Sequence, residues 1–167
     1  MGIPILLYNV PSRTGVDIKP ETYQILSEHP NIRGTKEAGG NISALAKTAA
    51  LCGEGFDIYS GNDDQTLPVM ALGGKGVISV LANIMPRETH DMCRYFLDGK
   101  LEKSRKMQFK LLPVMEALFW DVNPIPVKTA LSIMGICGHY CRLPLTPMER
   151  GQKEKLEAVI RKYVKDN

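Results

Sequence analysis

The stretch FDIYSGNDDQTLPVMALGGKGVISV, residues 56–80, contains a complete strand–helix–strand unit. Its first run, 56–60, is rich in β-forming residues, and the helical pattern of 63–73 ends on a glycine. A glycine turn then leads into another apolar β run at 76–81. Because two buried strands joined through a helix lie parallel in one sheet, this stretch predicts an α/β fold.

The same alternation extends from this unit toward the N-terminus. Apolar or β-rich runs at 3–8 and 32–36 each precede a helical pattern. The run at 3–8 is continuously apolar and predicts a fully buried strand. The helical pattern at 19–30 follows it, with Tyr23, Ile25 and Leu26 predicted to point inward.

Two residues mark the ends of the next helix. Asn41 is predicted to cap its first turn and Gly53 to close it. The sequence therefore predicts four adjacent parallel strands, at 3–8, 32–36, 56–60 and 76–81.

From Leu101 onward the strand pattern stops. A helix at 86–97 completes the last α/β unit, and three further helices are predicted at 101–119, 124–134 and 147–164, the last with a capping box at Thr146–Glu149. We predict two parts: a (βα)₄ half-barrel at 1–99 and C-terminal helices at 100–167. A closed (β/α)₈ barrel needs eight units and about 250 residues, so these four strands cannot close one.

Composition and charge exclude several classes of function. The chain has 167 residues, a net charge of +3 and 44% hydrophobic residues. Its basic residues form no concentrated patch, which argues against nucleic-acid binding. No apolar run approaches the roughly 20 residues of a membrane helix. The cysteines predict reduced thiols of a cytoplasmic protein, and CGHYC at 137–141 lacks the second ligand pair of a structural metal site.

Polar residues follow the predicted strands, and Lys36 is the most informative of them. In parallel α/β folds, functional side chains gather at the carboxyl ends of strands. A lysine held there away from bulk water is more readily neutral, and a neutral amine can attack a ketone to form a Schiff base. Tyr8 ends the neighbouring strand and could relay protons. Arg13, in the turn that follows, suits a carboxylate. A snorkelling lysine, a buried tyrosine and a surface arginine remain the alternative interpretations.

Four segments together resemble the 4-hydroxy-tetrahydrodipicolinate synthase family. They are LLYNVPSRTG, GTKEAGGN, YSGNDDQTLPVMALGGKGVISV and NPIPVKTAL, at 6–15, 34–41, 59–80 and 123–131. The resemblance implies the C-terminal half of a (β/α)₈ barrel with a helical extension. It implies a lyase of lysine and diaminopimelate biosynthesis that condenses pyruvate with aspartate 4-semialdehyde, needs no cofactor or metal, and forms a homo-oligomer.

The resemblance also implies roles for five residues. Lys36 matches the imine-forming lysine, Tyr8 the proton-relay tyrosine and Arg13 the arginine that binds the semialdehyde. Gly61 and Ile78 match backbone positions that line the pyruvate pocket. Strands one to four of the barrel, with a threonine pair that contacts pyruvate, are expected to be absent or supplied by a partner chain.

Three interpretations of function remain open from the sequence. The chain is a synthase fragment that is inactive or impaired alone, a non-catalytic half-barrel with a structural or interaction role, or a related aldolase similar to N-acetylneuraminate lyase. Arg13 argues against the last, because it favours a second substrate that bears a carboxylate. An exposed strand edge would favour a partner chain in either of the first two.

Overall fold

The computed structural model describes residues 2–164. The chain divides into two compact units, one up to Ser79 and the other from Val80 onward. All the strands belong to the first unit, and the second is helical. The predicted functional division, between residues 99 and 100, stays a prediction.

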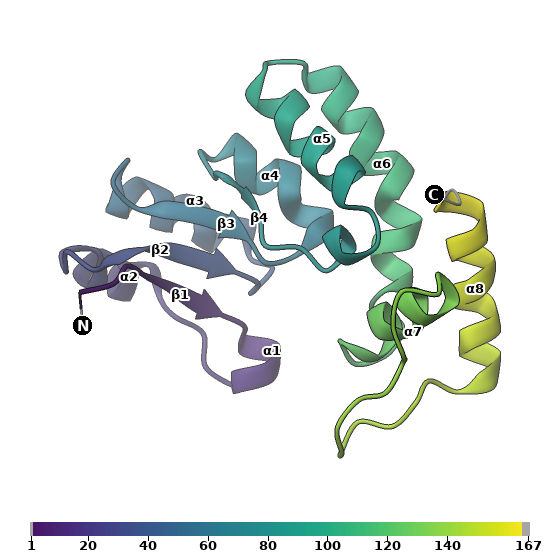
Figure 1. Cartoon of the computed structure of the whole chain (residues 1–167). Helices are drawn as coiled ribbons and strands as arrows, with labels where there is room; N and C mark the ends of the chain where they lie inside the picture. The colour runs from purple at the N-terminus through teal and green to yellow at the C-terminus, as the bar shows by residue number, and fades with distance from the viewer. Residues whose placement is uncertain (1, 165–167) are drawn as a thin grey trace. The chain divides into compact units, whose positions relative to one another are not determined.

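The first unit contains one four-stranded sheet (Figure 1). All its strands are parallel and lie in chain order, which confirms the predicted topology. They are β1 (Ile5–Asn9), β2 (Ile32–Glu37), β3 (Asp57–Ser60) and β4 (Gly76–Val77).

The last strand is much shorter than the predicted run at 76–81. Only Gly76 and Val77 pair with β3, which itself ends at Ser60. Ile78 N donates to Ser60 O at 2.9 Å, and beyond this point β3 offers no further residue to pair with. The apolar residues that follow form instead a 3₁₀ turn, η2 (Leu81–Asn83), in which Leu81 is buried.

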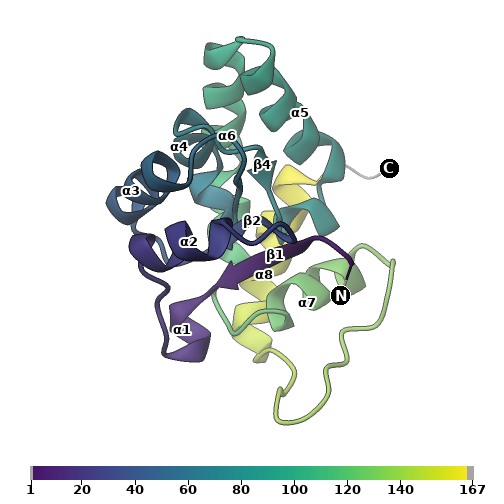
Figure 2. The same cartoon turned by 90° about the vertical axis from the view of Figure 1, so that its left-hand side faces the viewer.

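The prediction that the first strand is fully buried is wrong. In β1, Leu6 and Tyr8 are 43% and 50% exposed, whereas Leu7 packs against the core. β1 is an edge strand that pairs only with β2 among the described residues. The helices α2 (Pro20–Ser27), α3 (Ile42–Cys52) and α4 (Thr66–Ala71) all lie on one side of the sheet (Figure 2).

The core of the first unit lies between these helices and the sheet. Its buried residues are Tyr23, Leu45, Phe56, Ile58 and Val69. The rings of Tyr23 and Phe56 are 5.9 Å apart and tilted by 59°. The face of the sheet opposite this core, which we call the open face, presents Leu6, Tyr8, Lys36 and Tyr59 by strand alternation.

Local sequence signals explain both ends of helix α3. Asn41 Oδ1 accepts a hydrogen bond from Ala44 N at 3.0 Å, and Gly53 ends α3 with φ 68°, as predicted. Ile25, predicted to point inward, is 69% exposed. It follows Tyr23 by two positions, which places it on the opposite side of the helix. The predicted helix at 63–73 is divided into a 3₁₀ turn, η1 (Asp63–Gln65), and α4.

The second unit contains four helices of predicted position. They are α5 (Pro86–Leu97), α6 (Leu101–Ala117), α7 (Ile125–Ile133) and α8 (Arg150–Tyr163). α5 packs along α6, and α8 packs against both α6 and α7. The predicted capping box is wrong: α8 begins at Arg150, after an extended Glu149 that makes no capping hydrogen bond with its side chain.

Gly34 is required by the close approach of β2 to β3. A Cβ added there would lie 2.0 Å from the carbonyl oxygen of Asp57. We expect Gly34→Ala to lower the free energy of unfolding by about 1–3 kcal/mol, because the backbone must shift. Gly55→Ala is the matched control, since a Cβ at Gly55 meets nothing within 4 Å, and it should change stability by less than about 0.5 kcal/mol. Urea unfolding measures both; equal stabilities would contradict the argument.

Candidate active site

Strand register brings Lys36 and Tyr8 together on the open face. Tyr8 is the register partner of Lys36 in β1, and Tyr59 is its partner in β3. The Nζ atom of Lys36 lies 4.2 Å from the centroid of the Tyr8 ring. The two side chains therefore point to the same side of the sheet. An ammonium group at this distance from a ring face gains about 0.5–1 kcal/mol at exposed sites.

Arg13 belongs to the short helix α1 (Pro11–Thr14), directly after β1. Gly15 ends this turn with φ 71°, in the left-handed region that favours glycine. The guanidinium is exposed and forms no ion pair with any residue between 2 and 164. It is thus a free cation on the loop that follows the Tyr8 strand.

Gly61 and Ile78 follow β3 and β4 at the same edge of the sheet. Gly61 N donates to Glu37 O at 2.7 Å, and Ile78 N donates to Ser60 O at 2.9 Å. Each strand end is thereby bonded to the one before it. Gly61 must be glycine here, because a Cβ would lie 2.7 Å from the Cβ of Ala38. With their N–H groups used, these residues would present carbonyl oxygens to a ligand.

A network of polar groups, in which Asn9, Tyr23 and Thr35 are buried, lies on the other side of the same strand ends. Asn9 Nδ2 donates to Glu37 Oε1 at 3.0 Å, to Glu37 Oε2 at 3.1 Å and to Asp17 Oδ1 at 2.9 Å. Asn9 Oδ1 accepts from Ile18 N at 3.1 Å. We call Asn9, Asp17, Tyr23, Thr35 and Glu37 the Asn9–Glu37 network.

Tyr23 connects helix α2 to this network. Its hydroxyl donates to Glu37 Oε2 and lies within hydrogen-bonding distance of Thr35 Oγ1, both at 3.1 Å. Burial raises the pKa of Tyr23 well above its usual range. The Thr35 hydrogen bond lowers the pKa in part, and the negative charge of Glu37 raises it again. Tyr23 is therefore a neutral donor over the whole physiological range of pH.

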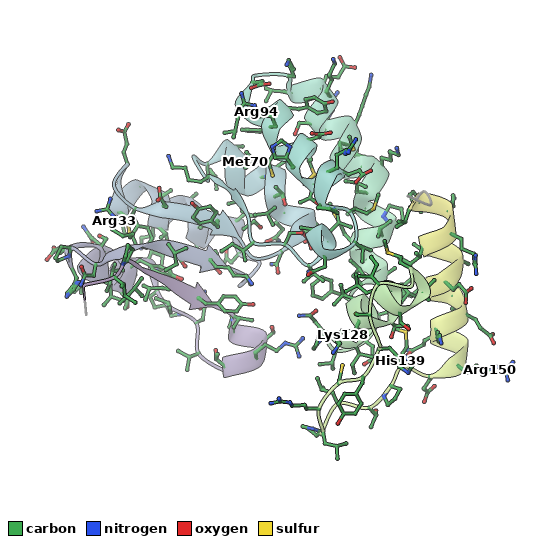
Figure 3. All side chains as sticks on the ribbon, viewed as in Figure 1. Arg33, Met70, Arg94, Lys128, His139 and Arg150 are labelled. Atoms are coloured by element: carbon green, nitrogen blue, oxygen red, sulfur yellow. The ribbon has the colours of Figure 1, made fainter. Side chains whose placement is uncertain are left out.

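The described residues offer neither a cluster of metal ligands nor a membrane-spanning helix. Within residues 2–164, no three His, Cys, Asp or Glu side chains come together in a way that could hold a metal ion. The CGHYC segment lies in a loop of the second unit, where Lys128 donates to the carbonyl oxygen of Tyr140 (Lys128 and His139 are labelled in Figure 3). None of the described helices is both long enough and apolar enough to cross a membrane.

Comparison with known proteins adds an independent observation. The sequence matches the Dihydrodipicolinate synthetase family over residues 1–163. The chain belongs to this family. A 4-hydroxy-tetrahydrodipicolinate synthase from Caldicellulosiruptor saccharolyticus is 56% identical over 163 residues, which cover 98% of this chain and 55% of that relative.

Solved structures of dihydrodipicolinate synthases also superpose closely on this chain. The dihydrodipicolinate synthase of Thermotoga maritima aligns with a TM-score of 0.95 at 41% identity, over 98% of this chain and 57% of that chain. The chloride-inhibited dihydrodipicolinate synthase of Acinetobacter baumannii, complexed with pyruvate, aligns with a TM-score of 0.93 at 36% identity. The alignment covers 96% of this chain and 55% of that chain. The fold is therefore part of the dihydrodipicolinate synthase barrel, and the chain spans about 55% of its relatives' length.

Asn9 and Glu37 directly follow Tyr8 and Lys36 in the sequence, at strand ends where polar residues gather. For Tyr23, the sequence pattern predicts only that it points inward from a helix, and assigns it no part in the site. One signal could have found it. Thr35, Asn9 and Glu37 are polar residues on the strand positions that face the helices, and such positions need partners when buried.

The shifted pKa of Tyr23 predicts how stability changes in alkali. The folded chain keeps this proton at pH values where an unfolded tyrosine, of pKa about 10, loses it. Its contribution to stability is complete below pH 10 and falls as the pH rises further, by up to about 1.4 kcal/mol per pH unit. In urea unfolding above pH 10, Tyr23→Phe should therefore lose stability less steeply than the wild type. Tyr140→Phe, at an exposed position, should follow the wild type; identical slopes for Tyr23→Phe and the wild type would contradict this account.

Proposed function

We propose that this chain supplies the imine-forming half of a lyase that condenses pyruvate with aspartate 4-semialdehyde. This reaction is a step of lysine and diaminopimelate biosynthesis, and the chain's relatives are named 4-hydroxy-tetrahydrodipicolinate synthases. The observation that supports this most directly is the position of Lys36 Nζ, 4.2 Å from the Tyr8 ring on the open face of the sheet. The pyruvate complex of the related Acinetobacter baumannii enzyme supports pyruvate as the first substrate.

In the proposed reaction, the neutral amine of Lys36 attacks the keto carbon of pyruvate. The keto oxygen takes up a proton, and the resulting carbinolamine loses water to form an iminium ion. Loss of a proton from the methyl carbon then gives an enamine, whose carbon attacks the aldehyde of the second substrate. Tyr8 is the group that exchanges protons with the oxygen during these steps. The amine itself supplies the covalent catalysis, so the proposal invokes no cofactor or metal.

The other predicted residues receive roles in substrate binding. Arg13, in the short helix α1 after β1, forms no ion pair with the residues that the structure describes, and it would bind the carboxylate of the semialdehyde. Gly61 and Ile78 would border the pyruvate subsite with backbone carbonyl oxygens. The second unit is not assigned a role in the chemistry.

A partner is part of this proposal. β1 is an edge strand whose exposed side chains include Ile5, Leu6 and Tyr8. Unpaired edges and exposed apolar faces favour association with another chain segment. Further copies of this chain or a separate chain bearing the remaining barrel strands would cover them. A non-catalytic role remains the second candidate, because the same exposed edge supports it. A cytoplasmic location stays a prediction.

Reductive trapping tests the role of Lys36. With pyruvate and borohydride, we expect one covalent pyruvyl adduct per chain, located on Lys36 by peptide mass spectrometry. Lys36→Arg should form none, because a guanidinium is not nucleophilic at neutral pH. Tyr8→Phe should still form the adduct, more slowly by about 10²–10⁴-fold, since the ring remains and the hydroxyl is lost. An unmodified Lys36 after prolonged treatment would refute the imine role and leave the non-catalytic function.

A turnover assay tests whether the chain alone catalyses the condensation. We expect the chain alone to condense pyruvate with the semialdehyde at a negligible rate, because its open face leaves the reacting groups in water rather than in an enclosed site. A full-length relative assayed in parallel provides the reference. Turnover by the isolated chain close to that of the relative would contradict this expectation and would indicate that copies of the chain rebuild an enclosed site.

A further inference from the structure

We propose that Glu37 is a positioning residue, which acts with Asn9 and Tyr23 to hold the Lys36 amine over the Tyr8 ring. Glu37 itself points away from the open face and does not touch the reacting atoms. The catalytic consequence rests on the function proposed above, whereas the geometric part stands by itself.

The backbone links the Asn9–Glu37 contact on one face of the sheet to the positions of Tyr8 and Lys36 on the other. Asn9 follows Tyr8, and Glu37 follows Lys36, so each pair of neighbours points to opposite faces. The register pairs Tyr8 with Lys36 and Asn9 with Glu37. A side-chain bond between Asn9 and Glu37 therefore fixes the twist of the two strand ends from which the reacting side chains project.

The contacts of Glu37 are unusually complete. Its carboxylate accepts from Asn9 Nδ2 with both oxygens, from the Tyr23 hydroxyl at 3.1 Å and from Gly39 N at 2.6 Å. Asn9 and Tyr23 are 3% and 1% exposed. Gly39 must be glycine for this contact, because a Cβ there would lie 2.7 Å from Glu37 Oε1. The strand ends, helix α2 and the loop after β2 thus meet at a single carboxylate.

Every partner of this carboxylate is a donor. Glutamine has nearly the same shape, but its amide nitrogen would face Asn9 Nδ2 together with either the Gly39 N–H or the Tyr23 hydroxyl. In either rotation of the amide, Asn9 Nδ2 keeps one acceptor instead of two, and either the Gly39 N–H loses its acceptor or the Tyr23 hydroxyl must turn to accept. Glu37→Gln therefore disturbs the network while leaving the volume of the side chain unchanged.

The next strand is bonded differently at the same register position. Ser60 of β3 is the register partner of Glu37, but its hydroxyl donates within its own segment, to Asn62 O at 2.7 Å. At this register position, the side-chain connection is made between β1 and β2, the two strands that bear Tyr8 and Lys36.

Nuclear magnetic resonance provides a test that needs no activity. Reductive methylation with carbon-13 formaldehyde labels the lysine amines, and the Lys36 signal is assigned by its loss in Lys36→Arg. In the wild type we expect this signal to be shifted upfield by the Tyr8 ring, and Tyr8→Leu gives the unshifted value. Glu37→Gln should move the signal more than half of the way to that value, and Tyr23→Phe should move it in the same direction by less.

The matched control is Val69→Ala, which alters the buried core under α4, a helix that packs against β3 and β4. It should lower the melting temperature and leave the Lys36 signal in place. If Glu37→Gln and Tyr23→Phe lower the melting temperature but keep the wild-type Lys36 signal, the network serves stability alone and the proposal is wrong. Should Glu37→Gln fail to fold, the Tyr23→Phe spectrum decides.

Trapping with pyruvate and borohydride distinguishes a failure of the positioning role of Glu37 from a failure of the proposed lyase function. We expect Glu37→Gln to slow adduct formation at saturating pyruvate on the order of 10²-fold, because a displacement of about 1 Å has effects of this size. If the wild type forms no adduct, the proposed function fails while the Lys36 signal still decides whether Glu37 positions the amine. An adduct formed at the wild-type rate by a variant with a displaced signal would overturn the catalytic consequence only.

Discussion

In-register parallel pairing between β1 and β2 is the constraint on which the rest of the site depends. The register sets Tyr8 opposite Lys36 and Asn9 opposite Glu37. Because side chains alternate along a strand, a shift by one residue in either strand would separate the amine from the ring and move one of the pair to the opposite face. The same hydrogen-bonded ladder therefore determines both the open face and the Asn9–Glu37 network behind it.

The two faces of the sheet are in different environments. Helices α2, α3 and α4 exclude water from one face, where polar side chains such as Thr35 and Asn9 must find partners inside the protein. On the open face the side chains of Leu6 and Tyr8 stay accessible. Lys36 and Tyr8 thus lie on the accessible face, and the buried side chains of Asn9, Tyr23 and Thr35 lie on the face that the helices cover.

Edge position explains the main departures from the expected strands. A continuously apolar run normally indicates burial on both faces, yet β1 has one partner strand and one covered face. β4 is limited by the length of β3 rather than by its own β-forming residues. The chain belongs to the dihydrodipicolinate synthase family and spans about 55% of its relatives' length, and its four parallel strands are part of that barrel fold.

The sequence by itself determined the order of strands and helices, the family and the identity of Lys36, Tyr8 and Arg13 as candidate residues. These depend on local patterns, namely apolar runs, capping residues such as Asn41, and motifs that are contiguous in the chain. The tertiary structure alone decided which residues of β1 and β2 face each other, that Tyr23 joins Glu37, and that the first strand is exposed. Each of these results from contacts between segments distant in the sequence, and no local pattern specifies how such segments pair or what covers them.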